Sequence, residues 1–231
     1  MQKKPSIFIL GSTGKMGLAI KDSLNKDKFF SYHAGSSREK ASNNFIEIDK
    51  CKVILDFSSQ EANKKLLIYI KTNRIENKTI LIGTTSLEES TLEMWKAISI
   101  SNRLKCILAP NTSIGAYLLL KKSLLVAKTL TQHEFDIEIE ETHHKYKKDL
   151  PSGTALYIAN NLAKHLNYTV KFPRDCERKS KEIVINSTRA GGIFGEHKVR
   201  FISEEEEFTI LHRAISRNLF AKGALIIAKK L

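Results

Sequence analysis

The sequence predicts an α/β protein, with a Rossmann-like doubly wound parallel sheet and a second, α+β domain that holds an open mixed sheet. Three observations lead to this fold class. Through residue 112, short apolar runs alternate with segments that can form helices. A glycine-containing loop follows the first of these runs, and strand-like runs follow one another beyond residue 180. Two domains with a boundary near residues 111–115 therefore fit the chain.

The first half contains five apolar runs that are long enough for β-strands. They are residues 7–10, 32–35, 53–57, 80–82 and 106–108. Three segments between them can form helices: residues 16–25, 59–73 and 87–102. In a doubly wound parallel sheet, ligands bind at the carboxyl ends of the strands. Small, polar or glycine-containing loops stand at four of these ends, at residues 11–14, 56–58, 83–85 and 109–111.

The second half begins with a predicted helix from residue 116 to about 130. Residues 135–140 then alternate strictly between apolar and acidic, which predicts a strand with one buried face and one face toward water or another subunit. A further helix is expected from residue 154 to about 166. Three strands should follow, at residues 183–187, 198–202 and 208–211, with the acidic run 204–207 as a hairpin tip. A helix over residues 219–230 closes the chain.

The formal net charge of +13 has three explanations: compositional bias, attraction of small anions, or nucleic-acid binding. The lysines are scattered and no aromatic-rich binding motif accompanies them, so we expect no nucleic-acid partner. The longest apolar runs, such as residues 117–120, are too short to cross a membrane. Cys51, Cys106 and Cys176 are widely spaced and form no CxxC pair. They are expected to be reduced and structural, which suits a cytoplasmic protein.

The glycine loop has the sequence context of a dinucleotide-binding motif, because it follows an apolar strand and opens a helix. Glycines let the backbone approach a pyrophosphate, and the amides at the start of the helix attract its charge. The spacing is GxxGxxG, with Thr13 where the second glycine of GxGxxG would stand. The alternative is a tight strand–helix turn without a ligand. The candidate cofactor-binding residues here are Gly11, Ser12, Thr13, Gly14, Lys15 and Met16.

Two later loops are weaker candidates for the same site. Small residues after a strand are common, so turn formation alone could explain either loop. In the second loop, proline restricts the residue before it, and Asn111 or Ser113 could cap the helix that follows. The candidate cofactor-binding residues are Gly83, Thr84, Thr85, Ala109, Pro110, Asn111 and Thr112.

Residues 140–154 carry the strongest chemical signal, with two adjacent histidines followed by lysines. A metal site is one alternative, but the lysines would repel a cation and no further Cys/His set is in spacing. A structural histidine pair is another. The functional interpretation is an anion pocket with a proton donor, because histidine titrates near neutral pH. Ser152 is a good N-cap, so the amides of Gly153 and Thr154 could hold a carboxylate.

The motifs resemble the 4-hydroxy-tetrahydrodipicolinate reductase (dihydrodipicolinate reductase) family over nearly the whole chain. Besides the three loops above, the HHxxxK…PSGTA pattern of residues 143–155 stands in the family's order and spacing. Further matches are Arg189, Gly191, Gly195 and His197, and then His212, Ser216, Arg217, Phe220, Ala221, Gly223 and Ala224.

The resemblance implies reduction of 4-hydroxy-tetrahydrodipicolinate to tetrahydrodipicolinate with loss of water, in the diaminopimelate and lysine pathway. His143 would be the proton donor and Lys147 its partner or a second donor. His144, Gly153 and Thr154 would bind the carboxylates of the dicarboxylate substrate. The cofactor would be NADPH or NADH and would carry the hydride, so no metal is expected. Residues 1–112 with 214–231 would bind the dinucleotide, and residues 113–213 would bind substrate and join a homotetramer.

Cofactor preference depends on the end of the second strand, where an acidic residue selects NAD in dinucleotide-binding folds. That position falls at about Ser36, which carries no charge to repel a 2′-phosphate. Ser37 adds a hydroxyl, and Arg38 could pair with the phosphate through two hydrogen bonds. A shift of one residue would bring Glu39 nearer the ribose, and a plain surface turn is the alternative. We predict that NADPH binds at least as well as NADH.

Overall fold

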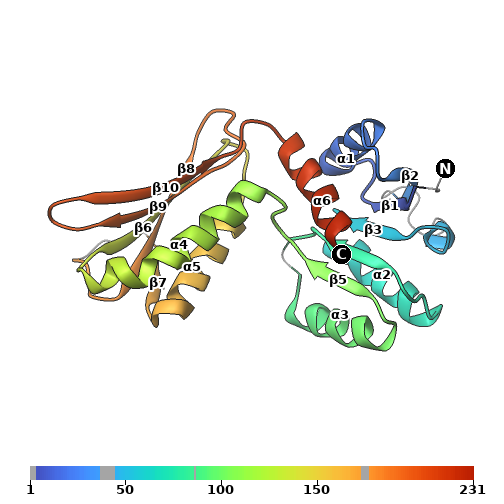
Figure 1. The fold of residues 1–231 in the computed structure, drawn as a ribbon, viewed down its shortest axis with the longest axis horizontal. Helices are drawn as coiled ribbons and strands as arrows, with labels where there is room; N and C mark the ends of the chain where they lie inside the picture. Colours follow the sequence, from blue (N-terminus) through green and yellow to red (C-terminus); the bar gives the residue numbers. More distant parts are fainter. Residues whose placement is uncertain (1–3, 37–44, 86, 173–176) are drawn as a thin grey trace. The chain divides into compact units, whose positions relative to one another are not determined.

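The computed structural model describes residues 4–36, 45–85, 87–172 and 177–231. The chain forms two compact units (Figure 1). The first consists of residues 1–112 together with residues 217–231, and the second of residues 113–216. Each unit has its own five-stranded sheet and its own apolar core.

The sheet of the first unit contains the five predicted strands and is parallel throughout. They are β1 (Ser6–Leu10), β2 (Ser31–Ser36), β3 (Val53–Asp56), β4 (Thr79–Ile82) and β5 (Lys105–Leu108), in the spatial order β2-β1-β3-β4-β5. The order reverses at β1, so the carboxyl ends of β1 and β3 lie next to each other. This is the place where doubly wound sheets bind nucleotides.

Helices cover both faces of this sheet. The helices α1 (Lys15–Asn25) and α6 (Asn218–Lys230) pack against each other on one face. The helices α2 (Gln60–Thr72) and α3 (Glu89–Ser101) cover the other face, together with the 3-10 turn η2 (Phe45–Ile48). Burial on both faces explains why the inner strands β1, β3 and β4 are continuous apolar runs rather than alternating ones. In β1, Ile7 faces α1 and α6, whereas its neighbour Phe8 packs in the core of α2 and α3.

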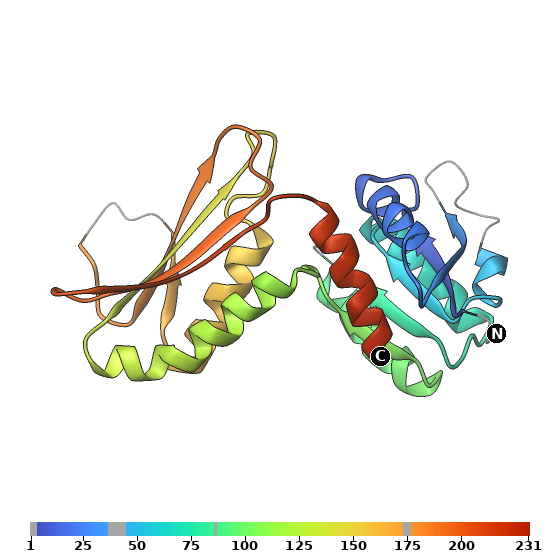
Figure 2. The ribbon, with the colours of Figure 1, turned by 45° about the horizontal axis from the view of Figure 1, so that its top comes forward.

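The sheet of the second unit is mixed, as predicted. Its strands are β6 (Asp136–His143), β7 (Thr169–Lys171), β8 (Glu182–Arg189), β9 (Glu196–Ile202) and β10 (Glu207–Arg213), in the order β10-β9-β6-β8-β7. The central strand β6 runs antiparallel to β9 and parallel to β8. The helices α4 (Ile114–Gln132) and α5 (Gly153–Leu166) lie side by side on one face of this sheet (Figures 1 and 2).

The alternation in β6 places its apolar residues in the core. Ile137 and Ile139 are fully buried under α4 and α5. Each such side chain contributes roughly 1.5–3 kcal/mol relative to an exposed one. Glu140 points to the other face, where it pairs with Arg200 at 2.6 Å and with Lys198 at 3.3 Å. The predicted strand with one buried and one charged face is confirmed, and it continues three residues farther, to His143.

Two short elements were not predicted, η2 and β7. Most of the predicted acidic tip is confirmed, since residues 204–206 are exposed between β9 and β10, whereas Glu207 is the first residue of β10 and binds Arg200. Within the described ranges, no helix combines the length and the apolar character needed to span a bilayer.

Candidate active site

A buried carboxylate, that of Glu141 near the end of β6, is the centre of the site. Its side chain is 0% exposed, and its neighbours come from three other parts of the chain. Arg189, at the end of β8, donates two hydrogen bonds to this carboxylate, of 2.7 and 2.9 Å. The backbone amide of Ser152 donates to the same carboxylate at 3.1 Å. The arrangement is a forked ion pair, the strongest geometry available to a carboxylate.

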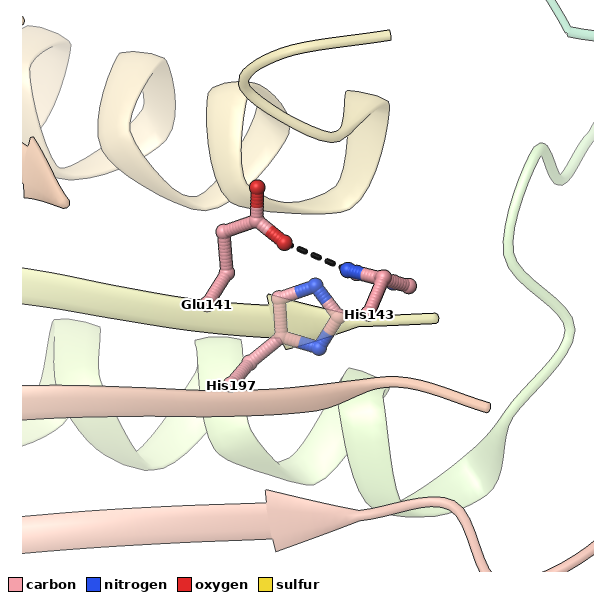
Figure 3. Close-up of side chains that lie close together, drawn as sticks. All are labelled: Glu141, His143 and His197. Carbon is pink, nitrogen blue, oxygen red and sulfur yellow. Dashed lines mark hydrogen bonds and ion pairs between the residues drawn. The ribbon is translucent and has the colours of Figure 1, made fainter. Parts of the chain in front are cut away.

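His143 lies two residues farther along β6, on the same face as Glu141 (Figure 3). Its Nδ1 hydrogen-bonds to Oε2 of Glu141. Burial by itself would raise the pKa of Glu141, but hydrogen bonds from His143 and Arg189 outweigh it and lower the pKa to about 2. The carboxylate is therefore ionised and accepts the Nδ1 proton. The imidazole is held in one orientation. Nε2 is its second nitrogen, the one that does not bond to Glu141.

Gly195 leaves the space next to that second nitrogen. A Cβ built on this glycine would lie 2.9 Å from Nε2 of His143. Its backbone φ of +156° is also one that side-chain-bearing residues rarely adopt. The glycine, which lies just before β9, thus lets the chain pass close to the imidazole without covering it.

His197 on β9 is the third side chain of the cluster. Its ring centroid is 5.2 Å from that of His143, and the two rings are nearly perpendicular. Burial lowers the pKa of His197 to about 3, and the nearby His143 acts in the same direction. It is therefore neutral, and its Nε2 hydrogen-bonds to the Ser152 hydroxyl at 3.2 Å. His197 packs against His143 and is a hydrogen-bond partner of Ser152 rather than a second acid.

Glu141, His143 and His197 offer ligand atoms that all lie within 4.8 Å of one another, which resembles a metal centre. The bonding argues against this use. Both oxygens of Glu141 already face the guanidinium of Arg189, and a cation would have to displace that ion pair. The cluster is better suited to holding and delivering a proton.

Lys147 follows the histidines in the loop between β6 and α5. Its ammonium pairs with Asp149 at 2.7 Å, and Asp149 in turn accepts from the amide of Gly153 at 3.4 Å. Burial opposes ionisation of Asp149, yet the bond from Lys147 prevails and lowers the pKa of this carboxyl. The backbone carbonyl of Asp149 also accepts from Arg189 at 2.6 Å. The loop that carries Lys147 is therefore tied to the ion pair around Glu141.

The start of α5 contains the residues that were predicted to bind a carboxylate. Ser152 is the N-cap, as predicted, and its hydroxyl accepts from the amide of Ala155 at 3.2 Å. Gly153 and Thr154 occupy the first turn, which contains no acidic residue. His144 stands on the other side of the loop, where its backbone amide donates to the carbonyl of Ile193 at 2.8 Å. Thus the predicted substrate residues all belong to one loop–helix segment next to His143.

The predicted dinucleotide loop has the backbone that close approach requires. Gly11 adopts φ +85°, and a Cβ there would lie 2.4 Å from the carbonyl oxygen of Phe57. Gly14 is the N-cap of α1 and forms no side-chain cap, and no acidic residue stands in the first turn. The fold therefore presents the start of a helix behind a glycine loop, at the carboxyl end of β1, which fits a pyrophosphate.

Most of the hydroxyl side chains around this loop form hydrogen bonds within the protein. The Ser12 hydroxyl bonds to the carbonyl of Ser36 at 3.3 Å, and that same carbonyl accepts from the amides of Gly11 and Ser12. The Thr84 hydroxyl donates to Asp56 at 2.9 Å, and that of Thr112 donates to the carbonyl of Phe220 at 2.7 Å. These hydroxyls shape the loops rather than face a ligand.

The preference between NADH and NADPH was predicted to depend on the end of β2. Ser36, the uncharged residue at the position where an acid would select NAD, is buried, at 1% exposed. Arg38, the residue predicted to meet a 2′-phosphate, lies outside the described residues, as do Ser37 and Glu39.

Sequence patterns assigned no role to Glu141, and Arg189 and His197 entered only through the resemblance. One signal could have found Glu141. It continues the buried phase of the alternation that begins at Ile137, and a buried acid must have a partner. The partner Arg189 is 48 residues away, and only the strand pairing of β6 with β8 brings the two together.

Comparisons with known proteins agree along the whole chain. The family description "Dihydrodipicolinate reductase, N-terminus" matches residues 5–112, and "Dihydrodipicolinate reductase, C-terminus" matches residues 115–231. The 4-hydroxy-tetrahydrodipicolinate reductase of Campylobacter lari is 38% identical, over 97% of this chain and 92% of that protein. The enzyme of the same name from Rickettsia rickettsii is 36% identical, over 95% and 90%.

Among solved structures, the dipicolinate-bound dihydrodipicolinate reductase from Paenisporosarcina sp. TG-14 has a similar fold. The TM-score is 0.76 with 25% sequence identity, and the match covers 99% of this chain and 94% of that one. Both family descriptions, the curated relatives and the fold point the same way. The chain belongs to the dihydrodipicolinate reductase family.

Proposed function

We propose that His143 donates the proton when this chain reduces 4-hydroxy-tetrahydrodipicolinate, with Lys147 as its partner or as a second donor. Members of this family are NAD(P)H-dependent oxidoreductases of diaminopimelate and lysine biosynthesis. The reaction takes up one hydride and one proton and releases one water. The observation that carries the proposal is the bond from Nδ1 of His143 to the ionised Glu141. It fixes the orientation of the ring and leaves Nε2 as the nitrogen that would face the substrate.

The dicarboxylate substrate would be held by the loop and by the start of α5. A substrate carboxylate would replace Asp149 at the amide of Gly153 and would also face the amide of Thr154, with the helix dipole favouring its charge. Lys147 and His144 supply further donors, and Lys147 balances the negative charge of the substrate. The solved Paenisporosarcina protein has dipicolinate bound, which supports a planar dicarboxylate as ligand.

The nicotinamide cofactor would lie on the glycine loop, with contacts from Gly83, Thr84 and Thr85 and from the loop of residues 109–112. When bound, it supplies the hydride, so no side chain has to undergo redox chemistry. Because Thr84 and Ser12 use their hydroxyls inside the protein, their contacts to the cofactor would come from the backbone. Residues 1–112 with 217–231 thus form the proposed dinucleotide unit, and residues 113–216 the proposed substrate unit.

We further propose that NADPH binds at least as well as NADH, through Arg38. Dissociation constants for both cofactors, in the wild type and in Arg38→Ala, test this. A loss for NADPH alone supports it, whereas equal losses, or a wild type that strongly favours NADH, contradict it.

The charged face of the second sheet, with Glu140 and Arg200, is the surface that a homotetramer would use. Light scattering of the purified protein measures that state directly. A cytoplasmic location is part of the same proposal, since it is where the biosynthetic substrate would be formed.

The activity is tested by following NAD(P)H absorbance while a synthase makes the substrate from pyruvate and aspartate semialdehyde. Absorbance should fall only when both precursors and this chain are present. Lys147→Ala should raise KM for the substrate and lower kcat while leaving cofactor affinity unchanged. Lys148→Ala, which removes the exposed lysine next to it, is the matched control and should behave as wild type. A Lys147 variant that loses mainly cofactor affinity would contradict the proposed role.

A further inference from the structure

A second buried carboxylate lies in the first unit, far along the chain from His143. Asp56 is the last residue of β3 and is 0% exposed. Its Oδ1 accepts from the amide of Ser58 at 3.1 Å and from the Thr84 hydroxyl at 2.9 Å. Its Oδ2 accepts from the side-chain amide of Asn63, on α2, at 2.6 Å. One carboxylate therefore joins the ends of two strands to a helix.

The network continues to the single tryptophan of the chain. Nε1 of Trp95, on α3, donates to the side-chain oxygen of Asn63 at 2.9 Å. Asn63 is thus fixed in one orientation, because its oxygen faces a donor and its nitrogen faces an acceptor. Each bond on the path from Trp95 to Thr84 joins a donor to an acceptor, and Asp56 accepts at both of its oxygens.

A carboxylate is an unusual choice for this place in a core. Burial raises the pKa of Asp56, while the bonds from Asn63, Ser58 and Thr84 oppose that rise. Buried charges are poor stabilisers, and apolar side chains often replace them without loss of stability. An apolar side chain could not accept the hydrogen bonds that join the turn of residues 56–58 to the loop that contains Thr84.

One of these loops contains Gly83 of the proposed cofactor site, and the other packs against Gly11. The amide of Gly83 donates to the carbonyl of Asp56 at 2.8 Å. A Cβ on Gly83 would lie 2.2 Å from the ring of Phe57, and one on Gly11 would lie 2.4 Å from the carbonyl oxygen of Phe57. Phe57 therefore sits in contact with both glycines. Any shift of the turn over residues 56–58 would move the surface on which a dinucleotide would lie.

We propose that Asp56 is a positioning residue for the cofactor, which holds the turn after β3 and the loop after β4 in the shape that the dinucleotide requires. The inference rests on the proposed cofactor site and adds to it a residue that acts through the two loops rather than by touching the cofactor. Asn63 is the second residue of this hydrogen-bond network, and it too is 0% exposed.

A swap of the two side chains tests this. In Asp56→Asn, an amide group would face the amide of Asn63, donor against donor, so the network must break. In Asn63→Asp, two carboxylates would face each other. The double variant Asp56→Asn/Asn63→Asp restores the pairing of donor with acceptor. The carboxylate introduced at position 63 would then accept from the amide introduced at position 56 and from the indole of Trp95.

We expect Asp56→Asn to raise the dissociation constants of NADH and NADPH about tenfold or more, the usual worth of a charged hydrogen bond. The inhibition constant of dipicolinate at saturating NADH and the kcat at saturating cofactor should stay near wild type. The double variant should recover most of the cofactor affinity. Emission from Trp95 in each variant reports whether the core around Asn63 is intact.

Thr84→Val is the milder variant, for the case that Asp56→Asn does not fold. It removes one bond to Asp56 and should raise both cofactor constants several-fold. Thr91→Val is the matched control, because Thr91 is equally buried on α3 and its hydroxyl has no partner among the described residues. It should bind both cofactors as wild type.

Three outcomes would overturn the inference: a folded Asp56→Asn with wild-type cofactor affinity, a double variant that is no better than the single one, or equal losses in Thr84→Val and Thr91→Val. A wild type that binds neither NADH nor NADPH would instead contradict the cofactor site itself. The two failures are therefore distinguishable.

Discussion

Glu141 determines which nitrogen of His143 could transfer a proton in the proposed reaction. Its ionised carboxylate occupies Nδ1, so only Nε2 is available, next to the space that Gly195 leaves open. Removal of a positioned general acid usually costs 100-fold or more in rate. The histidine and its orienting acid should thus affect kcat, and not the binding of the cofactor.

We predict that His143→Ala lowers kcat about 100-fold or more and leaves NAD(P)H affinity nearly unchanged. The coupled assay and a cofactor titration measure the two quantities. His165→Ala, at the exposed end of α5, is the control and should retain full activity. Near-normal turnover of the His143 variant would show that another group supplies the proton.

A second prediction concerns Glu141 and acid stability. Its pKa is about 2 in the folded chain, against 4.5 for a glutamate that is free in water, so its stabilising effect is complete above pH 4.5 and is lost as the pH falls toward 2. The loss amounts to about 3 kcal/mol. Glu141→Gln leaves Arg189 without its ion pair, so the variant should be less stable at pH 7 by several kcal/mol. Urea unfolding at pH 7 and pH 3 should show the gap between wild type and variant narrowing in acid, and a constant gap would contradict the assignment.

Residue types indicated an anion pocket with a proton donor in the His-His-Lys segment and the start of α5, because histidines, lysines and a serine cap have recognisable chemistry within a few positions of one another. The individual roles of His143 and Lys147 came from the family resemblance. Those roles stay predictions. Glu141 and Arg189 were harder to find, since an acid in a strand is usually solvated and an isolated arginine carries no pattern. Their pairing depends on strand order, which no local pattern contains.

At the scale of elements, the cap of α5 has two functions. The Ser152 hydroxyl accepts from the amide of Ala155 and also bonds to His197, so it joins the helix to β9. Ser59 caps α2 in the same way, accepting from the amide of Ala62 at 3.3 Å, but without such a bond to a histidine in the described part of the chain.

We therefore predict that Ser152→Ala destabilises the chain more than Ser59→Ala does. Loss of a serine cap typically costs about 1 kcal/mol, and the buried His197 would lose its bond in addition. Urea denaturation of both variants gives the comparison. Equal losses would indicate that the bond to His197 contributes nothing to stability.

Long, strongly patterned elements were predictable, and short edge elements were not. The inner parallel strands β1, β3 and β4 are apolar runs and β6 alternates, so both patterns stand out in the sequence. The strand β7 has only three residues, lies at the edge of its sheet and is mostly exposed. The turn η2 has four residues. Neither is long enough to show a period, and tertiary pairing rather than local pattern determines them.

At the scale of the whole molecule, the first unit depends on both ends of the chain. Ala221 and Ala224 of α6 are fully buried against α1 and the first sheet, in the same core as Ile20. Small side chains let the two helices approach closely, so a large or charged residue has no room there.

We predict that Ala224→Glu unfolds the first unit and abolishes NADH binding, because it buries a charge without a partner. The second unit, which is a continuous stretch of chain, should keep its own thermal transition. Lys222→Glu introduces the same charge on the exposed side of α6 and should do neither. Calorimetry and NADH titration measure the two effects, and loss of both transitions in Ala224→Glu would mean that the units do not fold separately.

The division of the chain also sets an order of events during protein synthesis. The strands of the first sheet leave the ribosome early, but α6, one of the helices that cover the sheet, is made only after residues 113–216. At roughly 5–20 residues per second, that face waits on the order of ten seconds for its cover. Residues 113–216 are contiguous and can fold as soon as they emerge. The part of the protein that is translated second is therefore completed first, and the nascent first sheet is the segment that chaperones would have to protect.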